Sequence, residues 1–225
     1  MGIVAQRDLS HLYAELLTDH AFAMTLQVHE LCRKSAGRLL TEFKPQLIIA
    51  IGGGGFIPAR ILRSFLRKDG SPNIPIQAIG LSLYESLGDD TEVEKIGKEV
   101  KRTQWLDFTS LGTMKNLIGK RILIVDEVDD SRTTLAYAVK ELEKDVEAAR
   151  QEAISKGMAD NLPKTEFYIF VLHNKDRKKD GILPDDMLAK RYEAAVTTGD
   201  VWINYPWEAL DIAEHDRLNA EGKKA

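Results

Sequence analysis

Four acidic residues lie within five positions of the segment ILIVDEVDDSRTT, residues 122–134. Asp126 and Glu127 directly follow a branched apolar run, so at least one carboxylate is held where a buried strand ends. Neighbouring carboxylates raise one another's pKa unless a cation or a hydrogen-bond donor offsets their charge. Such a pair is suited to accepting hydrogen bonds from vicinal sugar hydroxyls or to holding Mg²⁺ through water, and Asp130 is placed to manage a proton. A solvated acidic loop is the alternative.

A hydroxyl-rich stretch, SRTTL, follows the acids and leads into a predicted helix. Its backbone N–H groups and the hydroxyls of Ser131, Thr133 and Thr134 can surround a phosphate at the positive end of that helix. Simple capping of the helix by Ser131 or Asp130 is the alternative. The chain has no G-x-x-x-x-G-K-S/T motif, and the run GGGG departs from G-x-G-x-x-G because Ile57 takes the sixth position. A P-loop NTPase is excluded, and a dinucleotide site is disfavoured.

The elements that position these segments alternate between strands and helices. Apolar residues at helical spacing predict helices at 28–40, 57–67 and 133–157. Short β-branched runs predict strands at 46–55 (ending in the glycines), 74–84, 120–128 and 165–173, with short strand-like pieces at 192–196 and 200–207. This alternation predicts an α/β fold with a mainly parallel sheet flanked by helices. Ligands bind such sheets beyond the carboxyl ends of the strands, where both the glycines and the acids lie.

Two polar or peripheral stretches fit this pattern less well. Residues 84–108 form a long polar excursion without a strong period, which predicts a lid or binding loop. Residues 1–25, with the segment LSHLYAELL, have a helical pattern.

Composition narrows the class of protein. The chain has 225 residues, of which 44% are hydrophobic and 29% charged, values that are ordinary for one globular domain with a sizeable core. Its apolar runs are well short of the roughly 20 residues that span a bilayer. Cys32 is the one cysteine and no secretory signal is evident, so a cytoplasmic location is expected. The net charge of -4 argues against nucleic acid and favours small-molecule partners.

The acidic segment resembles the phosphoribosyl diphosphate (PRPP) signature of type I phosphoribosyltransferases. The segments IIAIGGGGFIPARI, GLSLYE, RTQWLDF, FVLHNKD and YPWE are similar to those of fungal purine phosphoribosyltransferases, and the likeness extends over about residues 28–211. The resemblance implies the type I phosphoribosyltransferase fold at 26–211, with a small hood subdomain from the N-terminal helix and about 174–211. Residues 1–25 would be an N-terminal extension and 212–225 a C-terminal tail. A homodimer is also implied.

The resemblance also implies roles for individual residues. Asp126 and Glu127 would hold the ribose hydroxyls of PRPP and, with Glu208, Mg²⁺, while Asp130 would take part in proton transfer near purine N7. The 5′-phosphate loop would comprise Asp129, Asp130, Ser131, Arg132, Thr133 and Thr134. The diphosphate loop would comprise Gly52, Gly53, Gly54 and Gly55. Trp202 would stack on the purine, Ile203 would offer its backbone, and Lys175 would bond the 6-oxo group. The lid would carry Tyr84, Lys101 and Arg102.

Several of these assignments leave alternatives open. Related bacterial and animal enzymes carry Arg or Lys where this chain has Gly53, so Mg²⁺ or another basic residue must supply the positive charge. Arg60, Lys101 and Arg102 are the candidates. His173 competes with Lys175 for the 6-oxo contact. Tryptophans such as Trp202 and Trp207, taken alone, are more often core residues than base platforms.

The implied reaction is Mg²⁺-dependent transfer of the 5-phosphoribosyl group from PRPP to N9 of xanthine, hypoxanthine or guanine. The products would be XMP, IMP or GMP and diphosphate, in purine salvage. Segments such as IPIQAIGLSLYE and FVLHNKD lean towards the branch that handles xanthine. A regulator that senses PRPP or purine without catalysis is the alternative, although a DNA-bound regulator would need a basic element that is absent apart from NKDRKK. A pyrimidine or orotate transferase is disfavoured by VWINYPWE, which resembles a purine hood.

Overall fold

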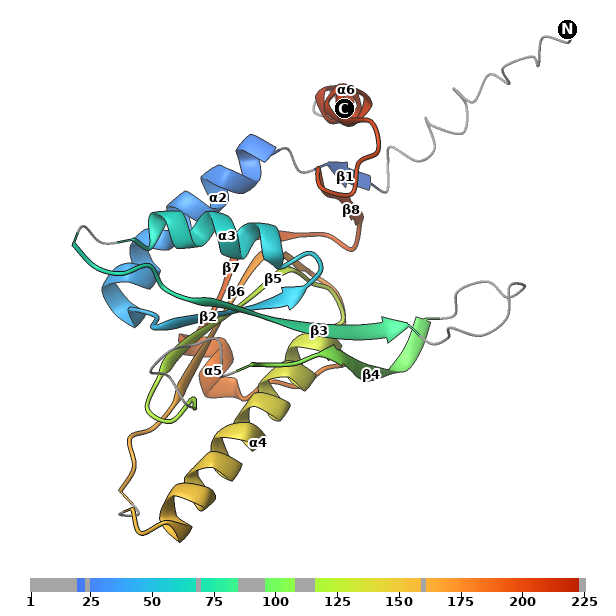
Figure 1. Ribbon diagram of the computed structural model, residues 1–225. Coiled ribbons are helices and arrows are strands. Elements are labelled where there is room, and N and C mark those ends of the chain that lie inside the picture. The colour runs from blue at the N-terminus through green and yellow to red at the C-terminus, as the bar shows by residue number, and fades with distance from the viewer. Residues whose placement is uncertain are drawn as a thin grey trace, which may run out of the picture.

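A computed structural model of the chain describes residues 20–22, 25–67, 70–84, 96–107, 116–158 and 161–222. Within these ranges a six-stranded sheet has the order β4-β3-β2-β5-β6-β7, and its pairs are parallel except for the antiparallel pair β3–β4 (Figure 1). The strands are β2 (Leu47–Gly52), β3 (Ile76–Tyr84), β4 (Ile96–Gln104), β5 (Arg121–Asp129), β6 (Glu166–Lys175) and β7 (Tyr192–Thr198). The predicted α/β fold with a mainly parallel sheet is confirmed.

Helices cover both faces of this sheet (Figure 1). On one face lie α2 (Thr25–Arg38), its π-helical continuation η1 (Leu39–Phe43) and α3 (Phe56–Phe65), and on the other α4 (Thr133–Ser155) and α5 (Asp185–Lys190). Alternate residues of the central strands feed the two cores: Ile48 and Ala50 pack with α2 and α3, whereas Ile49 and Ile51 pack with α4. Burial on both faces explains why the central strands are continuous apolar runs. Of the described helices, none is long and apolar enough to cross a bilayer.

A second, small sheet lies beside the large one. It consists of β1 (His20–Phe22) and β8 (Trp202–Asn204), which run parallel, and α6 (Ile212–Gly222) contacts β1 (Figure 1). The helical pattern expected over 1–25 is therefore wrong at 20–22, because backbone pairing with a distant strand overrides local preference. The segment LSHLYAELL lies outside the described residues.

The predicted domain limits stay a prediction, although two described elements bear on them. α2 packs against α3 and against β6 and β7 of the large sheet. Residues 212–222 of the predicted tail form α6.

The polar excursion predicted at 84–108 contains a strand. Residues 96–104 form β4, which pairs antiparallel with β3 at the edge of the sheet. Val100 is the one buried side chain among the described side chains of β4, and the others are exposed, so the sequence KEVKRTQ shows no apolar alternation that would reveal the strand. Residues 85–95 lie outside the described part.

Candidate active site

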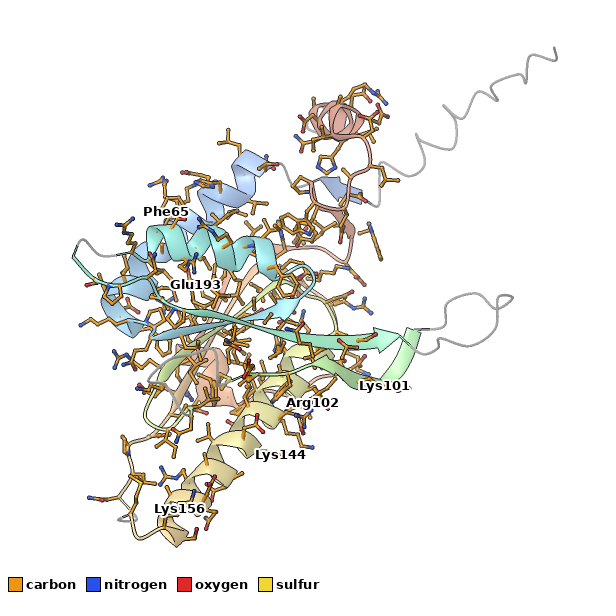
Figure 2. The ribbon with its side chains drawn as sticks, in the orientation of Figure 1. Phe65, Lys101, Arg102, Lys144, Lys156 and Glu193 are labelled. Carbon is orange, nitrogen blue, oxygen red and sulfur yellow. The ribbon has the colours of Figure 1, made fainter. Side chains whose placement is uncertain are left out.

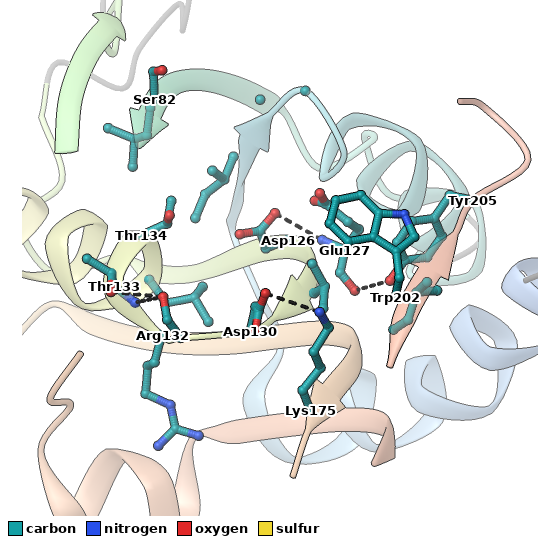
Figure 3. A pocket seen from close by; sticks show the side chains of 18 of the residues that line it. Ser82, Asp126, Glu127, Asp130, Arg132, Thr133, Thr134, Lys175, Trp202 and Tyr205 are labelled. Carbon is teal, nitrogen blue, oxygen red and sulfur yellow. Dashed lines mark hydrogen bonds and ion pairs between the residues drawn. The ribbon is translucent and has the colours of Figure 1, made fainter. Parts of the chain in front are cut away.

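A cavity of about 1040 Å³ opens at the carboxyl ends of β2, β5 and β6, next to β8 (Figure 3). Both stretches singled out in the sequence meet here, as the parallel sheet requires. The predicted site residues that line the cavity are Gly52, Gly53, Asp126, Glu127, Asp130, Ser131, Arg132, Thr133, Thr134, Lys175, Trp202, Ile203 and Glu208.

Other predicted site residues lie away from the cavity. The Arg102 guanidinium donates to Glu141 of α4 at 2.5 Å and covers the Trp105 ring, 4.4 Å from its centroid. Figure 2 shows Arg102 beside α4. Arg60 donates to Ser64 on its own helix at 2.7 Å, and neither Arg60 nor Lys101 lines the cavity within the described residues. The cations that line it there are Arg132, Lys175 and Arg177. The side chain of Tyr84 is outside the described part.

The acid pair sits on the cavity wall at the end of β5. Asp126 is 7% exposed, and burial, reinforced by the charge of Glu127, raises its pKa well above the ordinary value. Its Oδ1 accepts the Glu127 backbone N–H at 3.0 Å, whereas Glu127 Oε2 is buried without a hydrogen-bond partner among the described groups. Two crowded carboxylates with an unpaired oxygen suit a hard cation or sugar hydroxyls. The residues therefore fit Mg²⁺, which proteins often bind through one or two carboxylates together with substrate oxygens.

The glycine loop makes room for this pair. A Cβ at Gly54 would lie 1.9 Å from the Glu127 carboxylate carbon, and a Cβ at Gly55 would lie 2.5 Å from the carbonyl oxygens of Ile51 and Val125. Neither residue lines the cavity itself. At Gly53, by contrast, nothing described would meet a Cβ. The structure thus requires glycine at position 55, where a side chain would meet backbone atoms, whereas a side chain at position 54 would displace the Glu127 carboxylate.

Asp130 stands at the centre of a charge cluster. It accepts from Lys175 at 3.1 Å and from Arg177 at 3.0 Å, and Arg177 also reaches Asp200 at 3.2 Å. The Lys175 ammonium lies 5.8 Å from the centroid of the Trp202 ring, which is 59% exposed (Figure 3). A donor and an acceptor are therefore adjacent beside an open aromatic surface.

His173 faces elsewhere. Its Nδ1 lies 3.0 Å from the hydroxyl of Tyr205, burial lowers its pKa to about 4, and it does not line the cavity within the described part. Tyr205 donates to the Glu127 carbonyl at 3.0 Å. Since the single hydroxyl proton is used there, the oxygen accepts from His173 and Nδ1 carries the proton. Of the two candidates for the 6-oxo contact, Lys175 is the one that reaches the cavity, because β6 extends two residues beyond its predicted end.

The start of α4 forms the hydroxyl-rich loop. Arg132 is the N-cap residue, with a left-handed backbone (φ 66°) and no side-chain capping bond. Ser131 Oγ lies 2.9 Å from Thr133 Oγ1 and 3.4 Å from the Thr133 nitrogen, too long for a strong cap. The Asp130 carboxylate is engaged with Lys175 and Arg177 instead. The first turn of α4 thus keeps the capacity to bind an anion.

Asp129 points away from the cavity. It is fully buried and accepts from Arg132 at 2.8 Å and from the Tyr192 hydroxyl at 2.7 Å. Tyr192 consequently has a raised pKa, from burial first and this bond second. Asp129 therefore stabilises the hydroxyl-rich loop from its buried side, through Arg132 and Tyr192.

Sequence reasoning missed some residues of the cavity wall, namely Ser82, Arg177, Asp180 and Tyr205. Arg177 and Asp180 belong to the polar run NKDRKKDG, whose sequence does not indicate which of its charged residues reach a site. Tyr205 stacks on Trp207 at 4.6 Å with rings 9° from parallel. Trp207 packs against the core, which is the alternative that the sequence left open for both tryptophans. Trp202, by contrast, is exposed at the cavity.

The sheet, the acid pair and the hydroxyl-rich loop together form a site whose donors and acceptors suit a phosphorylated sugar. No family model matches the chain. The hypoxanthine-guanine phosphoribosyltransferase of Schizosaccharomyces pombe is 57% identical to it over 189 residues, which cover 84% of this chain and 89% of the relative. Xanthine phosphoribosyltransferase 1 of Saccharomyces cerevisiae is 57% identical over 194 residues, which cover 85% and 90%. The chain belongs to the purine phosphoribosyltransferase family.

Two solved structures share the fold, and one of them is a purine phosphoribosyltransferase. A protein from Neisseria gonorrhoeae with bound ppGpp has a TM-score of 0.66 and 36% identity, covering 91% of this chain and 97% of that one. A purine phosphoribosyltransferase from Pyrococcus horikoshii has a TM-score of 0.57 and 25% identity, covering 86% and 97%.

Proposed function

We propose that this protein transfers the 5-phosphoribosyl group of PRPP to N9 of a 6-oxopurine in purine salvage. The observation that carries the proposal is the 3.1 Å pairing of Lys175 and Asp130 beside the exposed ring of Trp202. O6 and N7 are neighbours on one edge of a 6-oxopurine, so Lys175 can donate to O6 while Asp130 accepts the proton of N7. The family membership and the names of the relatives support the same reaction.

The proposed arrangement also explains which bases are rejected. Lys175 offers only donors, and the 6-amino group of adenine presents donors in return. A base site built to bond an oxo group disfavours a substrate that leaves its polar atoms unpaired. We therefore expect xanthine, hypoxanthine and guanine as candidate substrates, with adenine excluded.

The chain's own groups account for the main steps. Asp130 takes the proton from N7 as N9 attacks C1 of PRPP, and its charge favours the positive sugar that forms when diphosphate departs. Trp202 orients the purine by stacking, and Ile203 offers backbone groups to its edge. The 131–134 loop binds the 5′-phosphate through amides and hydroxyls.

The acid pair would bind the ribose hydroxyls of PRPP and a magnesium ion. Asp126 and Glu127 supply the carboxylates, and Glu208 lines the same cavity as a third. When bound, Mg²⁺ would neutralise charge on the diphosphate leaving group. A requirement for the ion is tested by diphosphate release with and without EDTA.

One assay tests the proposed function. Purified protein is mixed with PRPP, Mg²⁺ and each base in turn, and released diphosphate is measured. We expect release with at least one 6-oxopurine and none with adenine or orotate. Tight PRPP binding without release from any base would instead indicate a sensor. Competition among xanthine, hypoxanthine and guanine then identifies the preferred base.

The oligomeric state and the cellular location of the protein are also proposals. We infer a homodimer in the cytoplasm from the family resemblance. Light scattering on the eluting protein measures the first, and fractionation of its source cells the second.

A further inference from the structure

The segment that connects β6 to α5, residues 176–184, lies directly behind the hydroxyl-rich loop. Lys179 Nζ donates to the backbone carbonyls of Asp129 at 2.7 Å and Asp130 at 2.8 Å. Its side chain is 15% exposed and lies 3.5 Å from the Asp129 carboxylate. A lysine in this position gives up most of its hydration and conformational freedom to bond two main-chain oxygens.

The next two residues continue the same contact. The amides of Asp180 and Gly181 donate to the carbonyl of Ser131 at 2.9 Å and 3.0 Å. A Cβ at Gly181 would lie 2.2 Å from the Arg132 carbonyl oxygen, so the two backbones approach as closely as glycine alone allows. Three successive carbonyls, those of 129–131, are therefore held toward this connector.

The direction of these carbonyls fixes the direction of two amides. The peptides that follow Asp130 and Ser131 are trans, and in a planar trans peptide the N–H points opposite to the C=O. The amides of Ser131 and Arg132 accordingly point away from the connector. Ser131 and Arg132 line the cavity, and Arg177 and Asp180 of the connector line it as well, whereas Lys179 and Gly181, within the described part, do not. We take the two amides to face the cavity, because they point away from Lys179 and Gly181. Successive amides that face one side form an anion site.

We propose that Lys179 is a positioning residue for the 5′-phosphate: it holds the loop carbonyls so that the amides of Ser131 and Arg132 face the bound phosphate. The inference rests on the proposed function. It assigns to Lys179 an effect on the phosphate end of the ligand, because Lys179 bonds the main chain of Asp129 and Asp130 and not the Asp130 carboxylate that would face the purine. The Asp129 carboxylate lies between Lys179 and Arg132, so these three side chains together carry one net positive charge.

Binding measurements on the full chain test this inference. Calorimetry gives the dissociation constants of IMP and inosine, which differ only in the phosphate, for wild type and Lys179→Met. We expect the variant to bind IMP roughly 10-fold or more weakly, the effect expected for lost bonds from a charged donor, with inosine unchanged. The KM for PRPP should rise while the KM for the base stays constant. Lys178→Met is the matched control, because Lys178 is its exposed neighbour.

Two further variants separate positioning from stability and charge. Lys179→Arg keeps a charged donor and should recover most of the IMP affinity. Gly181→Ala keeps the charge but pushes on the Arg132 carbonyl, and it should reproduce the selective loss. The inference would be overturned by equal losses of affinity for IMP and inosine, or by an unchanged ratio of their dissociation constants in both Lys179→Met and Gly181→Ala. Turnover by the wild type would leave the proposed function intact in either case. A wild type that binds none of IMP, GMP and XMP would refute the proposed function, and the inference with it.

Discussion

Replacing Asp130 by asparagine separates catalysis from stability. Amide and carboxylate have nearly the same shape, but the amide cannot accept the N7 proton, so kcat should fall by roughly 10² or more. The stability cost is much smaller. Although Lys175 is 8% exposed, the side chains of Asp130 and Arg177 are 43% and 39% exposed, so solvent screens the lost pairing. We expect about 1 kcal/mol for exposed pairs of this kind, or a fall of about 2–4 °C in Tm.

The assay combines initial rates of diphosphate release with a thermal melt. KM for PRPP should stay within about threefold of wild type, because the acid pair and the phosphate loop are untouched. Asp200→Asn is the control, since it removes the other partner of Arg177 from a side chain that does not line the cavity. Its kcat should be close to wild type. Turnover near the wild-type value in Asp130→Asn would refute the proton-transfer role.

Three further substitutions probe the rest of the site. Trp202→Ala should raise KM for the base far more than KM for PRPP, and steady-state kinetics with each substrate varied would expose the reverse pattern, which would place the stacking surface elsewhere. Gly54→Ala, whose methyl would overlap Glu127, should raise KM for PRPP roughly 10-fold while KM for the base holds; equal effects on both would contradict a local displacement. Asp126→Asn should abolish turnover yet raise Tm. Because burial raises the pKa of Asp126, folding favours its protonated form, so the destabilisation grows as pH rises through the raised pKa. The gain in Tm should accordingly be larger at pH 7 than at pH 4, and an equal gain at both would argue against a buried charge.

The central strands could be predicted because both faces are buried, which leaves an uninterrupted apolar run in the sequence. β4 could not, since Val100 is the one buried residue among its described side chains and a single apolar residue makes no alternation. β1 forms by pairing with β8, about 180 residues away in the chain, and such distant pairing leaves no local pattern. The interpretation of residues 9–17 as helical remains a prediction.

The acids of the site could be located from sequence, but their directions could not. Asp126, Glu127 and Asp130 line the cavity, whereas Asp129 turns inward to Arg132 and Tyr192. Adjacent side chains at a strand end can face either side, and the partners that decide this come from β7 and the connector. For the same reason, nothing in NKDRKKDG distinguished Lys179 from its neighbours.

The connector between β6 and α5 links the base end of the proposed site to its phosphate end. In the proposed complex Lys175 meets the purine, and four positions later Lys179 supports the loop that takes the phosphate. One stretch of main chain, held by strand pairing at one end and by bonds to residues 129–131 at the other, would therefore set the distance between the base and the phosphate. Adding or removing a residue between positions 175 and 179 would change the length of nucleotide that fits, even with every contacting side chain retained.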